Sequence, residues 1–203
     1  MTEKVPEHLQ VADELIAEGH TVSRETIPDD MAPWMANTIL AIDTFSRWTG
    51  FVVAWLVLPL CFAMVYEVVA RKFFVAPTMW AFDISRFLYG AMFTLGAAYA
   101  LARGVHIRAD FIYRNWSPRA QGRVDLVLFL LFYFPGLIVF MWMSIDYAFE
   151  AWSRGERGMD TAWMPYMGPI KSALPLGILF LLIQGVSEVL KAAYASRHNR
   201  WPF

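Results

Sequence analysis

The sequence predicts an all-α integral membrane protein with four transmembrane helices and both termini in the cytoplasm. Three observations support this prediction. Of the 203 residues, 58% are hydrophobic and only 17% are charged, whereas a soluble domain averages about 25% charged residues. The hydrophobic residues are gathered into four runs, each bounded by charged residues. Lys and Arg are also divided unevenly between the two sides that such runs would separate.

The four apolar runs are expected to be helices, because the bilayer core has no water to satisfy an open backbone. A crossing needs about 20 apolar residues, with a range of roughly 17–25. The runs cover residues 48–66, 87–102, 126–145 and 172–187. The second and fourth lengthen by including polar ends. We therefore expect spans at about 45–70, 80–102, 124–146 and 168–190, within a transmembrane domain of residues 36–192.

Residues 1–35, which precede this domain, are rich in acidic side chains. They lack the basic start and short apolar stretch of a secretory signal peptide, so we expect the first span to be uncleaved. The composition favours a solvated, partly disordered cytoplasmic tail. A short helix over residues 7–16 is the alternative. Residues 193–203 are expected to form a C-terminal tail.

Prolines lie near the middle of the first and third spans, at Pro59 and at Pro135 with Gly136. A proline inside a helix removes one hydrogen bond and kinks the helix. Broken helices also build ion sites in transporters. No charged residue accompanies either proline, so kinks are the favoured interpretation.

The second span begins with two ionisable residues, Asp83 and Arg86, which are one helical turn apart and can pair. Such residues near a membrane are functional candidates. Because they lie near a helix end, a pair that orients the helix or binds a partner is favoured over a transport site. Further along, Gly96, Ala100 and Gly104 recur every four residues, a spacing that lets helices approach closely.

The stretch ALARGVHIRADFIYRNW, residues 100–116, joins the second and third spans. His106 lacks the partner ligands that a zinc or haem site needs, so we expect it to form hydrogen bonds at an interface. Arg108 belongs to a belt of arginines that suits anionic lipid head groups. Asp110 is placed to pair with Arg108 or Arg114. We interpret the stretch as a charged elbow rather than a catalytic site.

The link between the third and fourth spans, residues 146–171, contains Trp152, Trp163 and Tyr166, which suit the interfacial aromatic belt. A docking surface for an extracytoplasmic protein is the alternative interpretation of this link. In the fourth span, Gln184 and Glu188 share a face, and we interpret them as part of a polar helix end.

Orientation follows from the Lys and Arg residues between spans, because cytoplasmic segments carry the excess. With four crossings, the side that holds both termini and the 103–125 link carries eleven, and the other side carries six. Both termini and the charged elbow are therefore expected to be cytoplasmic.

The sequence also excludes several function classes. The net charge of −1 offers no basic footprint for nucleic acid, and the single cysteine, Cys61, can form neither an internal disulfide nor a cysteine metal site. No carboxylate lies at the centre of a span, and no phosphate loop, nucleophile elbow or metal motif is present. We therefore expect a non-enzymatic membrane subunit without cofactor, metal or catalytic residues.

The chain resembles the DctQ family, the small membrane subunits of TRAP transporters, over about residues 38–192. In that family a proline and a tryptophan precede the second helix, and an acidic residue, an arginine and a Gly-Ala pair come next. A signature of His, Ile or Val, Arg, Val or Ala, and Asp follows that helix. Here these are Pro77, Trp80, Asp83, Arg86, Gly96 with Ala97, and residues 106–110. The stretches FIYRNWSPRAQGRVDLV and KSALPLGILFLLIQGVSEVL are similar to the mannitol/chloroaromatic-type subgroup.

The resemblance implies a multi-pass subunit of the bacterial inner membrane. It implies two protein partners, a large DctM-like permease and a soluble periplasmic DctP-like binding protein, beside the membrane lipids. The large permease would move an organic acid or similar solute by symport with an ion, and this chain would hold the permease in the bilayer. The candidates for structural or partner contacts are Trp80, Asp83, Arg86, Gly96, Ala100, Gly104, His106, Arg108 and Asp110. Two rival functions are a membrane anchor of a respiratory enzyme and a small autonomous carrier.

Overall fold

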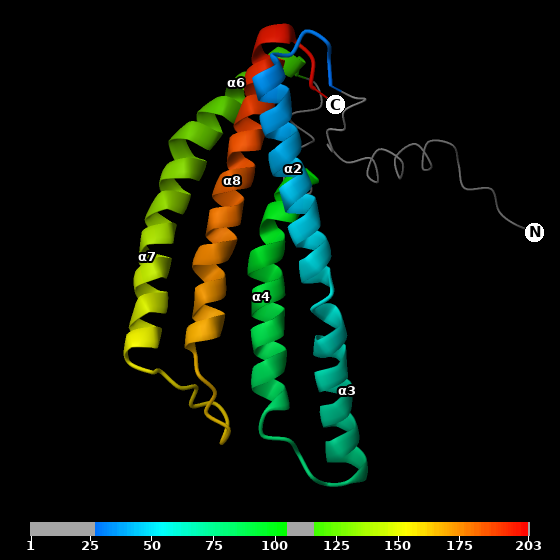
Figure 1. The fold of residues 1–203 in the computed structure, drawn as a ribbon, viewed down its shortest axis with the longest axis vertical. Helices are drawn as coiled ribbons and strands as arrows, with labels where there is room; N and C mark the ends of the chain where they lie inside the picture. Colours follow the sequence, from blue (N-terminus) through cyan, green and yellow to red (C-terminus); the bar gives the residue numbers. More distant parts are fainter. Residues whose placement is uncertain (1–26, 105–115, 203) are drawn as a thin grey trace, which may run out of the picture.

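The computed structural model describes residues 27–104 and 116–202. Their regular secondary structure is helical, apart from one isolated bridge between Arg157 and Tyr166, and turns and loops connect the helices. The helices form four columns along the long axis (Figure 1). In chain order they are α2 (Pro33–Ala54), α3 (Val57–Phe73), α4 (Ala81–Ala102), α6 (Pro118–Leu128), the π-helical turn η1 (Phe129–Tyr133), α7 (Phe134–Ser153) and α8 (Gly168–His198). The all-α prediction is confirmed.

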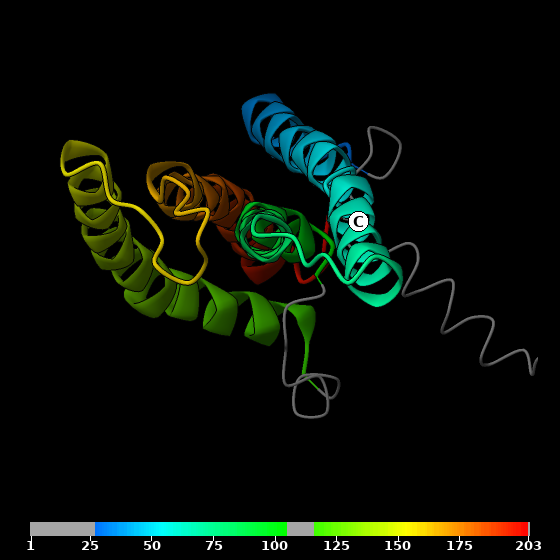
Figure 2. The same ribbon diagram turned by 90° about the horizontal axis from the view of Figure 1, so that it is seen from below.

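The four columns stand side by side, with α4 and α8 in the middle, α2 and α3 on one outside and α6 to α7 on the other (Figures 1 and 2). Among the described residues, three helical stretches are long and apolar enough to cross a membrane, namely Pro33–Phe73, Pro118–Ser153 and Gly168–His198. The fourth column, α4, falls outside that set and carries Asp83 and Arg86 in its first two turns. Its 22 residues measure about 33 Å at 1.5 Å per residue.

The expected kink at Pro59 is confirmed as a break between α2 and α3 at residues 55–56. Proline has no amide hydrogen, so it cannot bond the carbonyl four residues earlier, which belongs to Trp55. That carbonyl instead accepts a tighter bond from the amide of Leu58, at 3.2 Å. The helical path resumes at once, so one bent column continues from Pro33 to Phe73.

The other expected kink, at Pro135, is confirmed as a π-helical turn that ends just before the proline. The five residues before Phe134 form η1, in which the amide of Phe134 bonds the carbonyl of Phe129. The column from α6 to α7 is visibly curved around α8 (Figure 1). The turn directs Tyr133 toward α8, where its hydroxyl donates to the carbonyl of Leu181 at 2.8 Å.

Small residues set the closest approaches between the columns. A Cβ at Gly177 of α8 would lie 2.5 Å from the backbone oxygen of Thr94 in α4, and one at Gly122 of α6 would lie 2.7 Å from the backbone oxygen of Ala192 in α8. Contact at this distance excludes any larger side chain without displacement of a helix. Glycines therefore allow α8 to pack against both neighbours.

The outer columns bury little of their surface. In α3, only Ala63 is buried. In the most apolar part of Pro118–Ser153, no residue is buried. Large apolar side chains such as Phe62 (67% exposed) and Trp142 (72% exposed) point outward. A surface of this kind requires lipid or another membrane protein around it.

α8 continues to His198, through residues that we expected to be a tail. Residues 1–26, for which we expected a partly disordered tail with a short helix over 7–16 as the alternative, and most of the charged elbow lie outside the described residues.

Candidate functional site

Charged side chains divide each column into a charge-free band and two polar ends. The bands lie between Arg47 and Glu67, Arg86 and Arg103, Asp125 and Asp146, and Lys171 and Glu188. At 1.5 Å per residue these bands measure about 25–30 Å, which is the thickness of a bilayer core. We call the end where α2 begins and α8 finishes the termini end, and the end with the α3–α4 and α7–α8 connections the loop end (Figure 1).

At the loop end, Asp83 and Arg86 form the expected pair, with 3.3 Å between Nη2 of Arg86 and Oδ1 of Asp83. Asp83 is fully buried and also accepts a hydrogen bond from the hydroxyl of Thr161. Arg86 forms a second ion pair with Asp160. Both added partners belong to the connection between α7 and α8, so the pair fastens the start of α4 to that connection.

A second ion pair at the loop end joins Lys171, at the start of α8, to Glu156 in the same connection, at 2.5 Å. The Lys171 ammonium also lies 3.8 Å from the ring centroid of Tyr147 in α7. Lys171 is only 8% exposed. Its charge is therefore compensated by a carboxylate and by the negative face of an aromatic ring.

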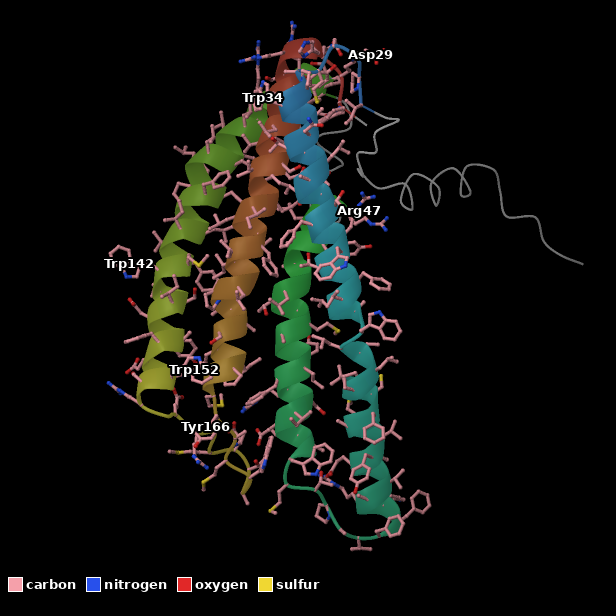
Figure 3. All side chains as sticks on the ribbon, viewed as in Figure 1. Asp29, Trp34, Arg47, Trp142, Trp152 and Tyr166 are labelled. Atoms are coloured by element: carbon pink, nitrogen blue, oxygen red, sulfur yellow. The ribbon has the colours of Figure 1, made fainter. Side chains whose placement is uncertain are left out.

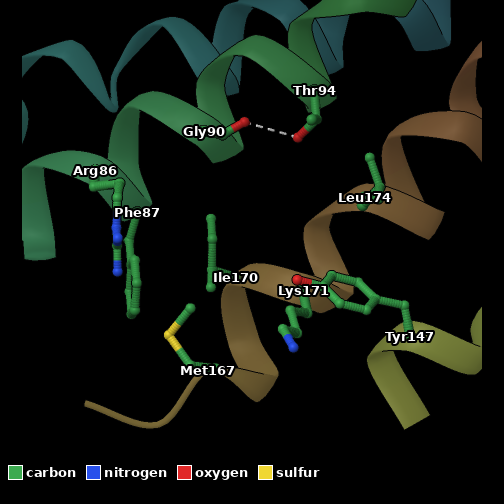
Figure 4. A pocket seen from close by; sticks show the side chains of 9 residues that line it. All are labelled: Arg86, Phe87, Gly90, Thr94, Tyr147, Met167, Ile170, Lys171 and Leu174. Atoms are coloured by element: carbon green, nitrogen blue, oxygen red, sulfur yellow. Dashed lines mark hydrogen bonds between the residues drawn. The ribbon is translucent and has the colours of Figure 1, made fainter. Parts of the chain in front are cut away.

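These groups border a cavity of about 370 Å³ between α4, α7 and α8. Figure 4 shows Arg86 and Phe87 on one side and Lys171 beside Tyr147 on the other. The remaining lining residues are Gly90, Thr94, Met167, Ile170 and Leu174. The only hydroxyl of α4 in the cavity, on Thr94, is bonded to the backbone of its own helix at Gly90. The cavity is therefore largely apolar, with both cations held by acidic partners at its edge.

Trp80 lies at the start of α4, where its ring is 5.6 Å from that of Tyr66 in α3. The contact packs the end of one column against the start of the next. Trp80 thus takes part in the α3–α4 hairpin itself.

The termini end holds a buried cluster that the sequence analysis did not identify. Lys191 of α8 is fully buried, and its Nζ lies 2.8 Å from Oδ2 of Asp43 in α2 and 2.9 Å from Oε1 of Glu188. Gln184 joins the two acids by donating to Asp43 at 3.0 Å and to Glu188 at 3.2 Å. One ammonium therefore balances two carboxylates in a site shielded from solvent.

Two serines complete the cluster between α2 and α8. Ser187 donates to Oδ1 of Asp43 at 2.7 Å, and Ser46 donates to the side-chain oxygen of Gln184 at 2.7 Å. Buried charges are tolerated when they are paired and hydrogen-bonded. The cluster therefore fixes the position of α2 along α8, since any sliding would leave buried charges unpaired.

A second contact at the termini end joins the segment before α2 to the segment after α8. The carboxylate of Asp30 accepts hydrogen bonds from the hydroxyl of Tyr194, at 2.6 Å, and from the guanidinium of Arg200. These two donors hold the pKa of Asp30 below its usual value, the Tyr194 bond having the larger effect. The same contacts raise the pKa of Arg200. The two ends of the described chain are thus joined by one charged group.

The expected stripe of small residues is only partly on one helix face. Gly96 faces α2, where an added Cβ would meet Val53 at 3.8 Å, and Ala100 is half-buried in the same helix. Gly104 follows the end of α4 with a φ of +66°, a left-handed conformation that favours glycine. It ends the helix instead of continuing the stripe. His106, Arg108 and Asp110 lie outside the described residues.

A sequence signal for the buried cluster existed in the spacing of polar residues. Gln184, Ser187, Glu188 and Lys191 recur at intervals of three and four, which places them on one face of α8. A polar face of this kind needs a polar partner, and Asp43 with Ser46 offers one in α2. We interpreted Gln184 and Glu188 as part of a polar helix end. The structure buries this polar end against α2, which begins earlier than the expected span.

Within residues 27–104 and 116–202, no group of three or more His, Cys, Asp or Glu side chains is placed to hold a metal ion. The buried charged groups Asp43, Glu188 and Lys191 bind one another and hold α2 against α8. The outer faces instead present apolar side chains, and Figure 3 shows Trp142 pointing away from α7.

Comparison with known families matches residues 60–194 to "Tripartite ATP-independent periplasmic transporters, DctQ component". The match covers more than half of the chain, from the start of α3 to the end of the buried cluster in α8. No curated protein sequence matches the chain significantly.

Proposed function

Since this chain belongs to the family of DctQ components of tripartite ATP-independent periplasmic transporters, we propose that it is the scaffold that holds a large permease subunit in the membrane. A component of such a transporter is not an enzyme. The large DctM-like permease would carry out transport of an organic acid or similar solute, driven by an ion gradient, and a soluble DctP-like protein would deliver the solute. We assign no transport site to the chain itself.

The observation that carries this proposal is the distribution of charge. Each described column contains a long apolar stretch that holds no charged side chain. Asp43, Asp83, Lys171, Glu188 and Lys191, which are all buried, form ion pairs within the chain near its two ends. A carrier needs polar groups along a path across the bilayer. A bundle that is rigid at both ends and apolar outside is suited to supporting a partner.

We place the chain in the bacterial inner membrane with four crossings, α4 included, and with the termini end in the cytoplasm. The excess of Lys and Arg at the termini end supports this orientation. The loop end, with Arg86, Lys171 and the α7–α8 connection, would then face the periplasm, where the soluble protein docks. We further propose the mannitol/chloroaromatic-type subgroup, on the two stretches quoted above.

The partner contacts that we assigned to Trp80, Asp83, Arg86, Gly96 and Ala100 are part of this proposal. Asp83 and Arg86 would act by shaping the loop end, because both are engaged within the chain. His106, Arg108 and Asp110 would contribute to the cytoplasmic elbow.

Affinity purification of the tagged chain from native membranes, followed by mass spectrometry, tests this function. We expect a large permease with many spans to co-purify in equal amount. Recovery of the chain alone, or with a redox subunit that shows a haem absorbance band, would contradict the scaffold function.

A further inference from the structure

A groove at the loop end, between α3 and α4, combines a basic rim with an apolar floor. It measures about 470 Å³ and is lined by Met64, Glu67, Val68, Arg71, Lys72, Ala81, Phe82 and Ser85. Its two helices stand side by side, α3 on the outside of the bundle and α4 next to it (Figure 1). The groove is separate from the buried clusters described above.

The charge of the groove is positive because its single acid is already engaged. Glu67 accepts hydrogen bonds from Nε and Nη2 of Arg71, at 3.0 and 2.5 Å, and from the backbone amide and hydroxyl of Thr78, the amide at 2.9 Å. No acidic side chain in the described chain pairs with Lys72, whose residue is exposed. One carboxylate and two cations leave a net charge of +1 at the rim.

The lining residues are ordered from apolar to basic along α3. Met64, Val68 and Lys72 are four residues apart, which places them on one face of the helix, one turn after another. Met64 lies inside the charge-free band, and Lys72 lies beyond its end at Glu67. A ligand in the groove would therefore meet Met64 at the edge of the charge-free band, and Val68, Phe82 and the Lys72 ammonium beyond it, toward the loop end.

We propose that this groove binds an anionic phospholipid from the leaflet at the loop end, with its phosphate at Lys72 and Arg71 and an acyl chain along Met64, Val68 and Phe82. The apolar lining matches an acyl chain, since Val68 and Phe82 are 63% and 60% exposed. The unpaired ammonium matches a phosphate. A partner helix of ordinary apolar sequence would leave that ammonium uncompensated.

Native mass spectrometry of the purified full chain, titrated with phosphatidylglycerol or phosphatidylcholine, tests this proposal. We expect preferential binding of phosphatidylglycerol. Lys72→Gln should weaken that binding about fivefold, the effect of one basic side chain near anionic lipid. Val68→Trp, which fills the groove and keeps its charge, should weaken binding of both lipids. Arg154→Gln is the matched control, because Arg154 is an exposed cation at the same end that is paired with Glu150 at 2.9 Å.

Two results would overturn the proposal. One is equal binding of the two lipids, or binding of phosphatidylglycerol that Lys72→Gln leaves unchanged. The other is displacement of the lipid by millimolar inorganic phosphate, which would show that the rim binds a free anion without using the groove. Retention of phosphatidylglycerol in excess phosphate supports the lipid.

Discussion

Replacing Lys191 by methionine should destabilise the bundle more than any other loss of a single cation. In the wild type, the buried Nζ lies 2.8 Å from Asp43 and 2.9 Å from Glu188. Methionine preserves much of the side-chain volume and removes the charge, which leaves two carboxylates facing each other without compensation. Removing one partner of a buried ion pair costs about 3–5 kcal/mol. For a chain of this length, that loss lowers the melting temperature by about 6–20 °C.

The assay is thermal unfolding of the purified chain in detergent, with Arg197→Met as the control. Arg197 lies in the same helix, two turns further on, and is exposed, so its loss should change the melting temperature by no more than a few degrees. A triple variant, Asp43→Asn with Glu188→Gln and Lys191→Met, removes all three charges and should recover much of the lost stability. Equal melting temperatures for Lys191→Met and Arg197→Met would refute the argument that the cluster is buried and balanced by one ammonium.

Three further variants test other contacts. Gly177→Val should destabilise the chain by about 1–3 kcal/mol, because the new side chain would overlap α4. Gly136→Val should reduce the stability far less, since a Cβ at that position meets no atom within 4 Å. Similar losses of thermal stability in the two variants would contradict this packing. Arg86→Glu should reduce co-purification of the large subunit by opposing the acids that Arg86 now binds, and unchanged recovery would count against the proposed partner role. The lowered pKa of Asp30 means that its carboxylate form stabilises the fold. The loss of stability caused by Asp30→Asn should therefore be complete at neutral pH and should disappear as the pH falls through that lowered pKa. A loss of stability that does not change with pH would exclude this ionic contribution.

The helices themselves follow from local sequence. Four apolar runs, bounded by charges, predicted the columns, and Pro59 and Pro135 predicted where two of them bend. The Asp83–Arg86 pair was also predictable, since both residues lie on one helix, one turn apart. Local spacing determines such features, so they need no knowledge of the tertiary structure.

The buried cluster depends instead on contacts between distant segments. Asp43 and Lys191 are far apart in the chain, and each alone resembles an ordinary charge near a membrane surface. Only the length of α2, which begins at Pro33 and extends beyond the bilayer core, brings the two together. The same holds for Asp160 and Thr161, whose contacts with the start of α4 depend on the path of the α7–α8 connection.

Solute uptake into proteoliposomes tests the central claim most directly. The large permease and the soluble binding protein would be reconstituted with and without this chain, and the chain would be reconstituted alone, under the same imposed ion gradient. The scaffold function predicts uptake only when all three proteins are present. Uptake by this chain alone, or undiminished uptake without it, would contradict the claim.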